Sequence, residues 1–179
     1  MKKYNLFDVI GPIMVGPSSS HTAGAARIGK AARDIYGKKF SSVTFYLHGS
    51  FQTTLEGHGS DRALVGGILG FEPDDDNLVN SLTIANEKGI SYSFINQDLG
   101  FVHPNTIKVV LHNDEEDFYI IGSSIGGGKI KIININGLEA EVTGDKPTIV
   151  AVYEDRLGII VDILLVLRNN KISVGNLKV

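Results

Sequence analysis

The chain carries two kinds of hydrophobic pattern, and together they predict a fold that mixes strands with helices. Short runs rich in β-branched and aromatic residues predict strands at 43–47, 90–95, 106–111, 118–122, 129–135 and 138–142. The last two runs flank Asn136-Gly137, a dipeptide typical of a two-residue hairpin turn. A short apolar stretch over 6–15 predicts a further strand or an extended lead-in. We expect an α/β (α+β) fold, a mixed sheet with flanking helices.

Three segments before residue 90 carry helical patterns. The first spans 22–36, follows three serines that can cap it, and ends at Gly37. Its side chains are mostly those of Ala and Gly, so it can lie very close to whatever packs on it. The second spans 61–69, with Ser60 or Asp61 as the expected cap, and the third spans 78–88.

A change of composition at 144–147 predicts a boundary between a domain over 1–143 and a smaller segment over 147–179. The smaller segment reads as a strand, a helix over 157–169 and a second strand, with the strands at 148–153 and 172–179. A single βαβ piece cannot bury both faces of its sheet. We therefore expect this segment to be completed by self-association with a second copy.

Composition excludes several classes of function. The net charge of −3 provides no electrostatic footprint for nucleic acid or an anionic membrane. The sequence contains no cysteine, which removes disulfides, thiolate nucleophiles and any iron–sulfur cluster held by this chain alone. No apolar run is long enough to span a bilayer, and the first residues do not resemble a signal peptide. We expect a cytoplasmic protein.

The most informative stretch is 16–22, Gly-Pro-Ser-Ser-Ser-His-Thr, where the first helix begins. Free N–H groups and the positive end of the helix dipole favour a carboxylate or a phosphate at such a place. The alternative is that one serine caps the helix and the others are solvated. Four hydroxyls around His21 favour binding. Residues 24–30 match most of a phosphate-binding P-loop, but Ala31 replaces the required hydroxyl, so nucleotide binding is not expected.

Four histidines stand at the ends of predicted elements or beside glycine, serine, asparagine or proline: His21, His48, His58 and His103. We expect them to converge on one cleft, where an imidazole can act as a base near neutral pH. The loop 122–128 adds Ser123, Ser124 and three consecutive glycines, whose N–H groups can face an anion. A run of glycines is also typical of a long turn or bulge.

Together these motifs resemble the β chain of the bacterial iron–sulfur L-serine dehydratases, over residues 6–143. The matching segments are 16–22, 48–50, 57–61 with 63–65 and 67–70, 103–105 and 122–128. Ser60 stands where the family usually has threonine, which keeps the hydroxyl. The segment 147–179 resembles the first half of an ACT domain, with Leu157 in place of the usual proline of an Asp-Arg-Pro-Gly turn.

The resemblance implies a pyridoxal-free elimination that converts L-serine to pyruvate and ammonia. In this family a [4Fe–4S] cluster on a partner α chain takes the substrate hydroxyl as a Lewis acid. The resemblance leaves the base open between His58 and His21, with His58 the leading candidate. The remaining candidates would bind or orient the substrate; they are Ser18, Ser19, Ser20, Thr22, His48, His103, Asn105, Ser123 and Ser124.

Two other functions compete with this one. The β-chain fold is similar to the allosteric substrate-binding domain of some phosphoglycerate dehydrogenases, which implies an amino-acid sensor without catalysis. A sensor needs hydroxyls and amides but not several histidines, so the histidines favour the enzyme. A metal hydrolase would use His48, His58 and His103 as ligands. The choice between L-serine and L-threonine stays open.

Overall fold

The computed structural model describes residues 11–179. The chain divides into two compact units, one that ends at Thr148 and one over Ile149–Val179. The proposed lead-in over 6–15 lies partly outside the described residues, and 11–15 form neither helix nor strand. No helix in the described part of the chain is long and apolar enough to cross a membrane.

The first unit contains the predicted mixed sheet, which has six strands in the order β2-β1-β3-β4-β5-β6. The strands are β1 (Ser42–Leu47), β2 (Ser91–Asn96), β3 (Thr106–His112), β4 (Asp117–Ser124), β5 (Ile130–Ile135) and β6 (Leu138–Val142). Strands β1 and β2 pair in parallel, and the other neighbours pair antiparallel. The fold class predicted from the sequence is confirmed.

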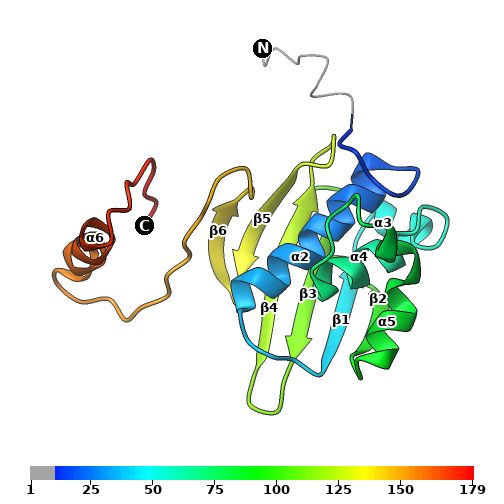
Figure 1. Cartoon of the computed structure of the whole chain (residues 1–179), viewed down its shortest axis with the longest axis horizontal. Helices are drawn as coiled ribbons and strands as arrows, with labels where there is room; N and C mark the ends of the chain where they lie inside the picture. The colour runs from blue at the N-terminus through cyan, green and yellow to red at the C-terminus, as the bar shows by residue number, and fades with distance from the viewer. Residues whose placement is uncertain (1–10) are drawn as a thin grey trace. The chain divides into compact units, whose positions relative to one another are not determined.

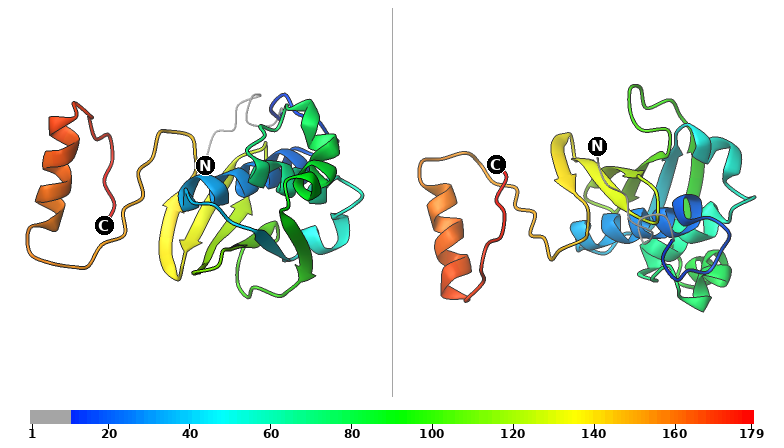
Figure 2. Two further views of the ribbon diagram at one scale, coloured as in Figure 1. Left: turned by 60° about the horizontal axis from the view of Figure 1, so that its bottom comes forward. Right: turned by 90° about the horizontal axis from the view of Figure 1, so that it is seen from above.

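Helices cover one face of this sheet, as Figure 1 and the two views of Figure 2 show. They are α2 (Gly24–Tyr36), α3 (Ser50–Thr54), α4 (Ser60–Leu69) and α5 (Ser81–Glu87). Alternate residues of β1 point to this face, and Phe45 is fully buried there with Ile28 of α2 and Leu64 of α4. Burial of these apolar side chains is the main force that holds the helices on the sheet.

Helices α2 and α4 lie very close together because glycines stand at their contact. A Cβ atom added at Gly67 would lie 2.0 Å from the carbonyl oxygen of Ala26. One added at Gly29 would lie 2.4 Å from the carbonyl oxygen of Leu64. Neither position has room for a side chain, which explains why α2 is so rich in small residues.

The starts of α4 and of the third predicted helix differ from the sequence predictions. The residue that caps α4 is Gly59, in the left-handed region at φ 65°, and no side chain caps this helix. Ser60 instead donates its hydroxyl to the carbonyl of His21, at 2.7 Å. The third predicted helix is split into a 3₁₀ segment, η2 (Asp76–Asn80), and α5, because the side chain of Asp75 accepts from the backbone of Asn77 and starts a tight turn.

The second unit contains one helix, α6 (Ile159–Asn169). The strands predicted at 148–153 and 172–179 are not formed, so this part of the sequence prediction is wrong. A strand is stable only with a hydrogen-bonded neighbour, and neither segment pairs with one. Helix α6 has no buried residue, and Leu157 just before it is 101% exposed. The assignment of this unit to half of an ACT domain stays a prediction.

Candidate active site

One end of the sheet gathers most of the polar motifs. Leu47 at the end of β1 pairs with Ile107 of β3, and Ser123 near the end of β4 pairs with Thr106. The loops that follow β1 and β4 and the loop that precedes β3 therefore meet at this end. The start of α2 reaches the same place, because a Cβ at Gly24 would lie 2.2 Å from Ser124 Oγ.

A chain of hydrogen bonds links three of these segments. Ser18 Oγ accepts from the backbone N–H of His21 at 3.1 Å and lies 3.3 Å from Nδ1 of its ring. Nε2 of His21 lies 2.8 Å from Ser50 Oγ, and Ser50 in turn donates to Oδ1 of Asn105. Since the single hydroxyl proton of Ser50 goes to Asn105, Ser50 accepts from His21. The network therefore places a proton on Nε2 of His21.

The imidazole of His21 is packed between two other rings. The ring of His58 stacks on it with centroids 5.1 Å apart, and Phe51 meets it edge-on at 5.0 Å. Burial, and secondly the charge of His58, lower the pKa of His21 below the ordinary value of 6.5. His21 is therefore neutral at physiological pH, in agreement with its hydrogen bonds.

The loop that carries His58 is tied to the start of the first helix. Thr22 donates its hydroxyl to the carbonyl of His58 at 2.9 Å. Nδ1 of His58 is buried and has no hydrogen-bond partner in the described part of the chain, and the same holds for Oδ1 of Asp61. The ring of His58 is thus held by its backbone and by stacking on His21.

The serines before α2 differ in what their hydroxyls do. Ser18 caps the π-helical turn η1 (Ser19–Ala23), which begins three residues before the predicted helix start. Ser19 and Ser20 lie in this turn, half-buried, and their hydroxyls have no partner among residues 11–179. Ser18 therefore provides the expected cap, and Ser19 and Ser20 provide the expected free hydroxyls.

Two of the predicted histidines lie in the loop region beyond the hydrogen-bonded chain. Nδ1 of His48 accepts from the backbone of Leu99 at 3.1 Å and lies 3.4 Å from a carboxylate oxygen of Asp98. Nδ1 of His103 accepts from the backbone N–H of Asn105 at 3.1 Å. Both rings shape the loop 97–105, which holds Asn105 against Ser50.

Ser123 and Ser124 are buried beneath the site. Ser123 Oγ lies 2.7 Å from Thr106 Oγ1, and the side chain of Ser124 is fully buried with no partner for Oγ among the described residues. The three glycines that follow all have positive φ angles. Arg27 fixes this loop by donating to the carbonyl of Gly128 at 2.6 Å.

The sequence analysis did not place Ser50 and Phe51 in the site. Ser50 lies at the centre of the hydrogen-bonded chain, and Phe51 supports the ring of His21. The available signal was the motif His48-Gly49-Ser50. Gly49 has φ 57°, and a Cβ there would lie 2.2 Å from the carbonyl oxygen of Pro104, so glycine allows the two loops to touch.

The described residues include no group of three or more His, Asp or Glu side chains placed to hold a metal ion. His48, His58 and His103 in particular do not form such a group. The sequence also lacks cysteine, the usual ligand of iron–sulfur clusters. The residues of this chain therefore do not fit a resident cluster.

Comparison with known proteins identifies the family. A family model described as "Serine dehydratase beta chain" matches residues 5–89. The "L-serine dehydratase, beta chain" of Peptoniphilus asaccharolyticus is 49% identical over 99% of this chain and 81% of the relative. The chain belongs to the serine dehydratase beta-chain family. The resemblance predicted from the sequence motifs is confirmed.

Two further relatives support the assignment of this chain to the beta-chain family. The "Probable L-serine dehydratase, beta chain" of Bacillus subtilis (strain 168) is 43% identical over 100% of this chain and 81% of its own length. The "L-serine dehydratase 2" of Escherichia coli (strain K12) is 30% identical over 70% of this chain and 33% of its own length. The beta chain thus matches part of a longer dehydratase as well as separate beta chains.

Proposed function

We propose that this chain is the β subunit of an enzyme that converts L-serine to pyruvate and ammonia together with a partner α chain. The observation that carries the proposal is the assembly at one end of the sheet. Ser18, His21, Ser50 and Asn105 form one hydrogen-bonded chain there, with His58 stacked on it. The family of the chain supplies the reaction, and the assembly supplies groups that suit it.

We propose that the [4Fe–4S] cluster of the enzyme is carried by the α chain. The lack of cysteine and of a three-ligand group among the described residues supports this division. The β chain would then contribute what a serine substrate needs besides the cluster. These are a base for the Cα proton, donors for the carboxylate and acceptors for the ammonium group.

His58 is our candidate for the base. Nδ1 of His58 has no hydrogen-bond partner among the described residues, so no protein group competes there for the Cα proton. His21 is the weaker candidate because Ser18 and Ser50 occupy both of its ring nitrogens. In this scheme His21 orients the ring of His58 by stacking and stays neutral beside it.

We assign the substrate carboxylate to the start of the first helix. The hydroxyls of Ser19 and Ser20 have no partner among residues 11–179, and the first N–H groups of a helix favour an anion. Ser18 and Thr22 are also candidates from the sequence. Ser18 would fix this turn, and Thr22 would fix the loop that carries His58. Oδ1 of Asn105 accepts from Ser50, which leaves its amide N–H₂ for the substrate.

The other candidate residues would support the site without contacting the substrate. His48 and His103 fix the loop that carries Asn105. Ser123 and Ser124 form a buried polar layer under the start of α2. We propose that these four residues hold the polar wall in place while Ser19, Ser20 and Asn105 meet the substrate.

Anaerobic reconstitution with the cognate α chain tests the proposed function. Pyruvate is measured with L-serine as substrate, and L-threonine in a parallel assay decides the substrate preference. We expect turnover only when both chains are present. Binding of L-serine to the β chain without turnover in the reconstituted mixture would instead support the amino-acid sensor.

A further inference from the structure

Three segments around the site each expose a large apolar side chain to solvent. Ile13 is 86% exposed, Phe101 111% and Ile125 47%. Phe101 lies in the loop between β2 and β3, and Ile125 in the loop between β4 and β5, both at the end of the sheet that carries the site. We call these three residues the apolar rim.

The segments that carry the apolar rim are joined to one another. The backbone N–H of Ser124 donates to the carbonyl of Asn105 at 2.8 Å, which links the loops of Ile125 and Phe101. A Cβ atom at Gly128 would lie 2.8 Å from the ring of Pro12, so the segment of Ile13 lies against the loop of Ile125. The rim residues thus come from three connected segments that adjoin the polar site.

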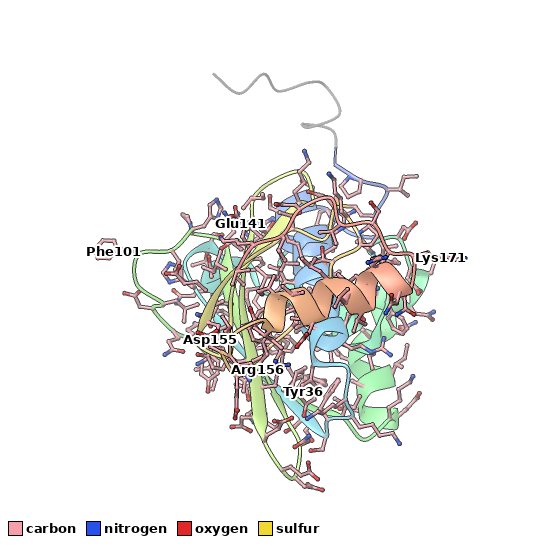
Figure 3. The ribbon with its side chains drawn as sticks, turned by 90° about the vertical axis from the view of Figure 1, so that its left-hand side faces the viewer. Tyr36, Phe101, Glu141, Asp155, Arg156 and Lys171 are labelled. Atoms are coloured by element: carbon pink, nitrogen blue, oxygen red, sulfur yellow. The ribbon has the colours of Figure 1, made fainter. Side chains whose placement is uncertain are left out.

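Phe101 is exposed on a loop that forms hydrogen bonds of its own. Oδ1 of Asp98 accepts from the backbone of Gly100 at 2.9 Å, and the carbonyl of Gly100 accepts from Val102 at 2.9 Å. Figure 3 shows the labelled ring of Phe101 pointing away from the body of the molecule. An aromatic side chain presented on a preorganised loop is typical of an anchor at a protein interface, because little entropy is lost when it binds.

We propose that the apolar rim is the surface on which the α chain docks, with Phe101 inserted into an apolar pocket of that chain. This inference rests on the proposed function, which requires the α chain to bring its cluster to the polar site. The segments of the rim adjoin that site, and the loop of Phe101 continues into His103 and Asn105. A second copy of this chain would cover the site without supplying ligands for a cluster, so the α chain is the better occupant.

The dissociation constant of the complex between the full β chain and the anaerobically purified cognate α chain tests this surface. We expect Phe101→Ala to raise the dissociation constant about 10- to 30-fold, the range of an anchor residue. Phe101→Trp should restore binding to near the wild-type value. Leu138→Ala is the matched control, because Leu138 is 55% exposed in the hairpin at the opposite end of β5.

The kcat of Phe101→Ala at saturating α chain should equal that of the wild type, because Phe101 docks the partner and does not touch the substrate. An unchanged thermal midpoint of the variant will show that it is folded. A wild-type dissociation constant for Phe101→Ala, or an equal loss in Leu138→Ala, would overturn the docking surface while leaving the proposed function intact. Failure of the wild-type β chain to bind the α chain would overturn both.

Discussion

Nε2 of His21 lies 2.8 Å from Ser50 Oγ, and this bond joins the turn before α2 to the first residue of α3. Because Ser50 also donates to Asn105, its hydroxyl sets both the protonated nitrogen of His21 and the direction of the Asn105 amide. A single serine thereby orients two groups that come from distant parts of the sequence.

Replacing Ser50 should disturb both groups. We expect Ser50→Ala to lower kcat/KM about 10- to 100-fold, because it leaves a partly buried imidazole N–H and an amide oxygen without partners. Ser50→Thr keeps the hydroxyl and should recover most of the activity. Nitrogen NMR of the isolated chain provides a second readout, since the Nε2–H of His21 should lose the chemical shift of a hydrogen-bonded group in Ser50→Ala only. An unchanged Nε2 resonance in that variant would refute the orienting function of Ser50.

The base assignment predicts different results for the two stacked histidines. His58→Ala in the reconstituted enzyme should lower kcat about 10²- to 10⁴-fold with a smaller change in KM, the usual effect of losing a general base. His21→Gln keeps donor and acceptor capacity and should cost less. Steady-state kinetics with L-serine measure both. Near-normal kcat in the His58 variant, with a large loss in the His21 variant, would transfer the role of base to His21.

The serines at the helix start should affect binding more than chemistry. We expect Ser20→Ala to raise the KM for L-serine about 5- to 10-fold and to change kcat less, because one hydrogen bond to a charged carboxylate is lost. Ser19→Ala should behave alike. Thr22→Ala is the contrasting variant, since its hydroxyl holds the His58 loop and its loss should appear in kcat. A Ser20 variant that changes kcat alone would contradict the carboxylate assignment.

Because α2 and α4 cross so closely, one methyl group added at their contact should lower the stability of the protein strongly. Gly67→Ala should lower the free energy of unfolding by about 1–3 kcal/mol or more, because the new Cβ meets a backbone carbonyl that cannot move aside. Gly57→Ala is the control, since a Cβ there would have no neighbour within 4 Å. Urea unfolding of both variants measures the difference, and equal midpoints would rule out the steric explanation.

We predict that the second unit self-associates through its exposed apolar side chains. Val161 and Val166 of α6 are both exposed, and no residue of this helix is buried. We expect the chain to form oligomers at high concentration, and Val166→Asp to shift them toward monomer, since a charge opposes burial at an interface. Asn170→Asp adds the same charge at a polar position and should have little effect. Sedimentation velocity distinguishes these outcomes, and a strictly monomeric wild type would contradict the prediction.

The sequence predicted local structure well where local chemistry decides it. Asn136 and Gly137 adopt positive φ angles of 47° and 90° and join β5 to β6 as their turn chemistry requires. The prediction failed for 148–153 and 172–179, because β-propensity alone does not provide a neighbouring strand. These two segments have the composition of strands without the partner that a strand needs.

The candidate site shows the same limit at the level of single side chains. Ser60 has the chemistry of a helix cap, yet its hydroxyl bonds the carbonyl of a residue 39 positions away. The motif His48-Gly49-Ser50 marks the segment of Ser50, but only the fold shows that its hydroxyl meets His21 and Asn105. Motif spacing therefore indicated which segments matter, and only the tertiary contacts show which hydroxyl each segment uses.

The two bonds between the helix start and the His58 loop form a reciprocal pair. Thr22 donates to the carbonyl of His58, and Ser60 donates to the carbonyl of His21. Each segment thus supplies the hydroxyl that fixes the other segment's histidine. For protein engineering, this makes 16–22 and 57–61 a single module: a chimaera that takes one segment from a distant relative must take the other with it.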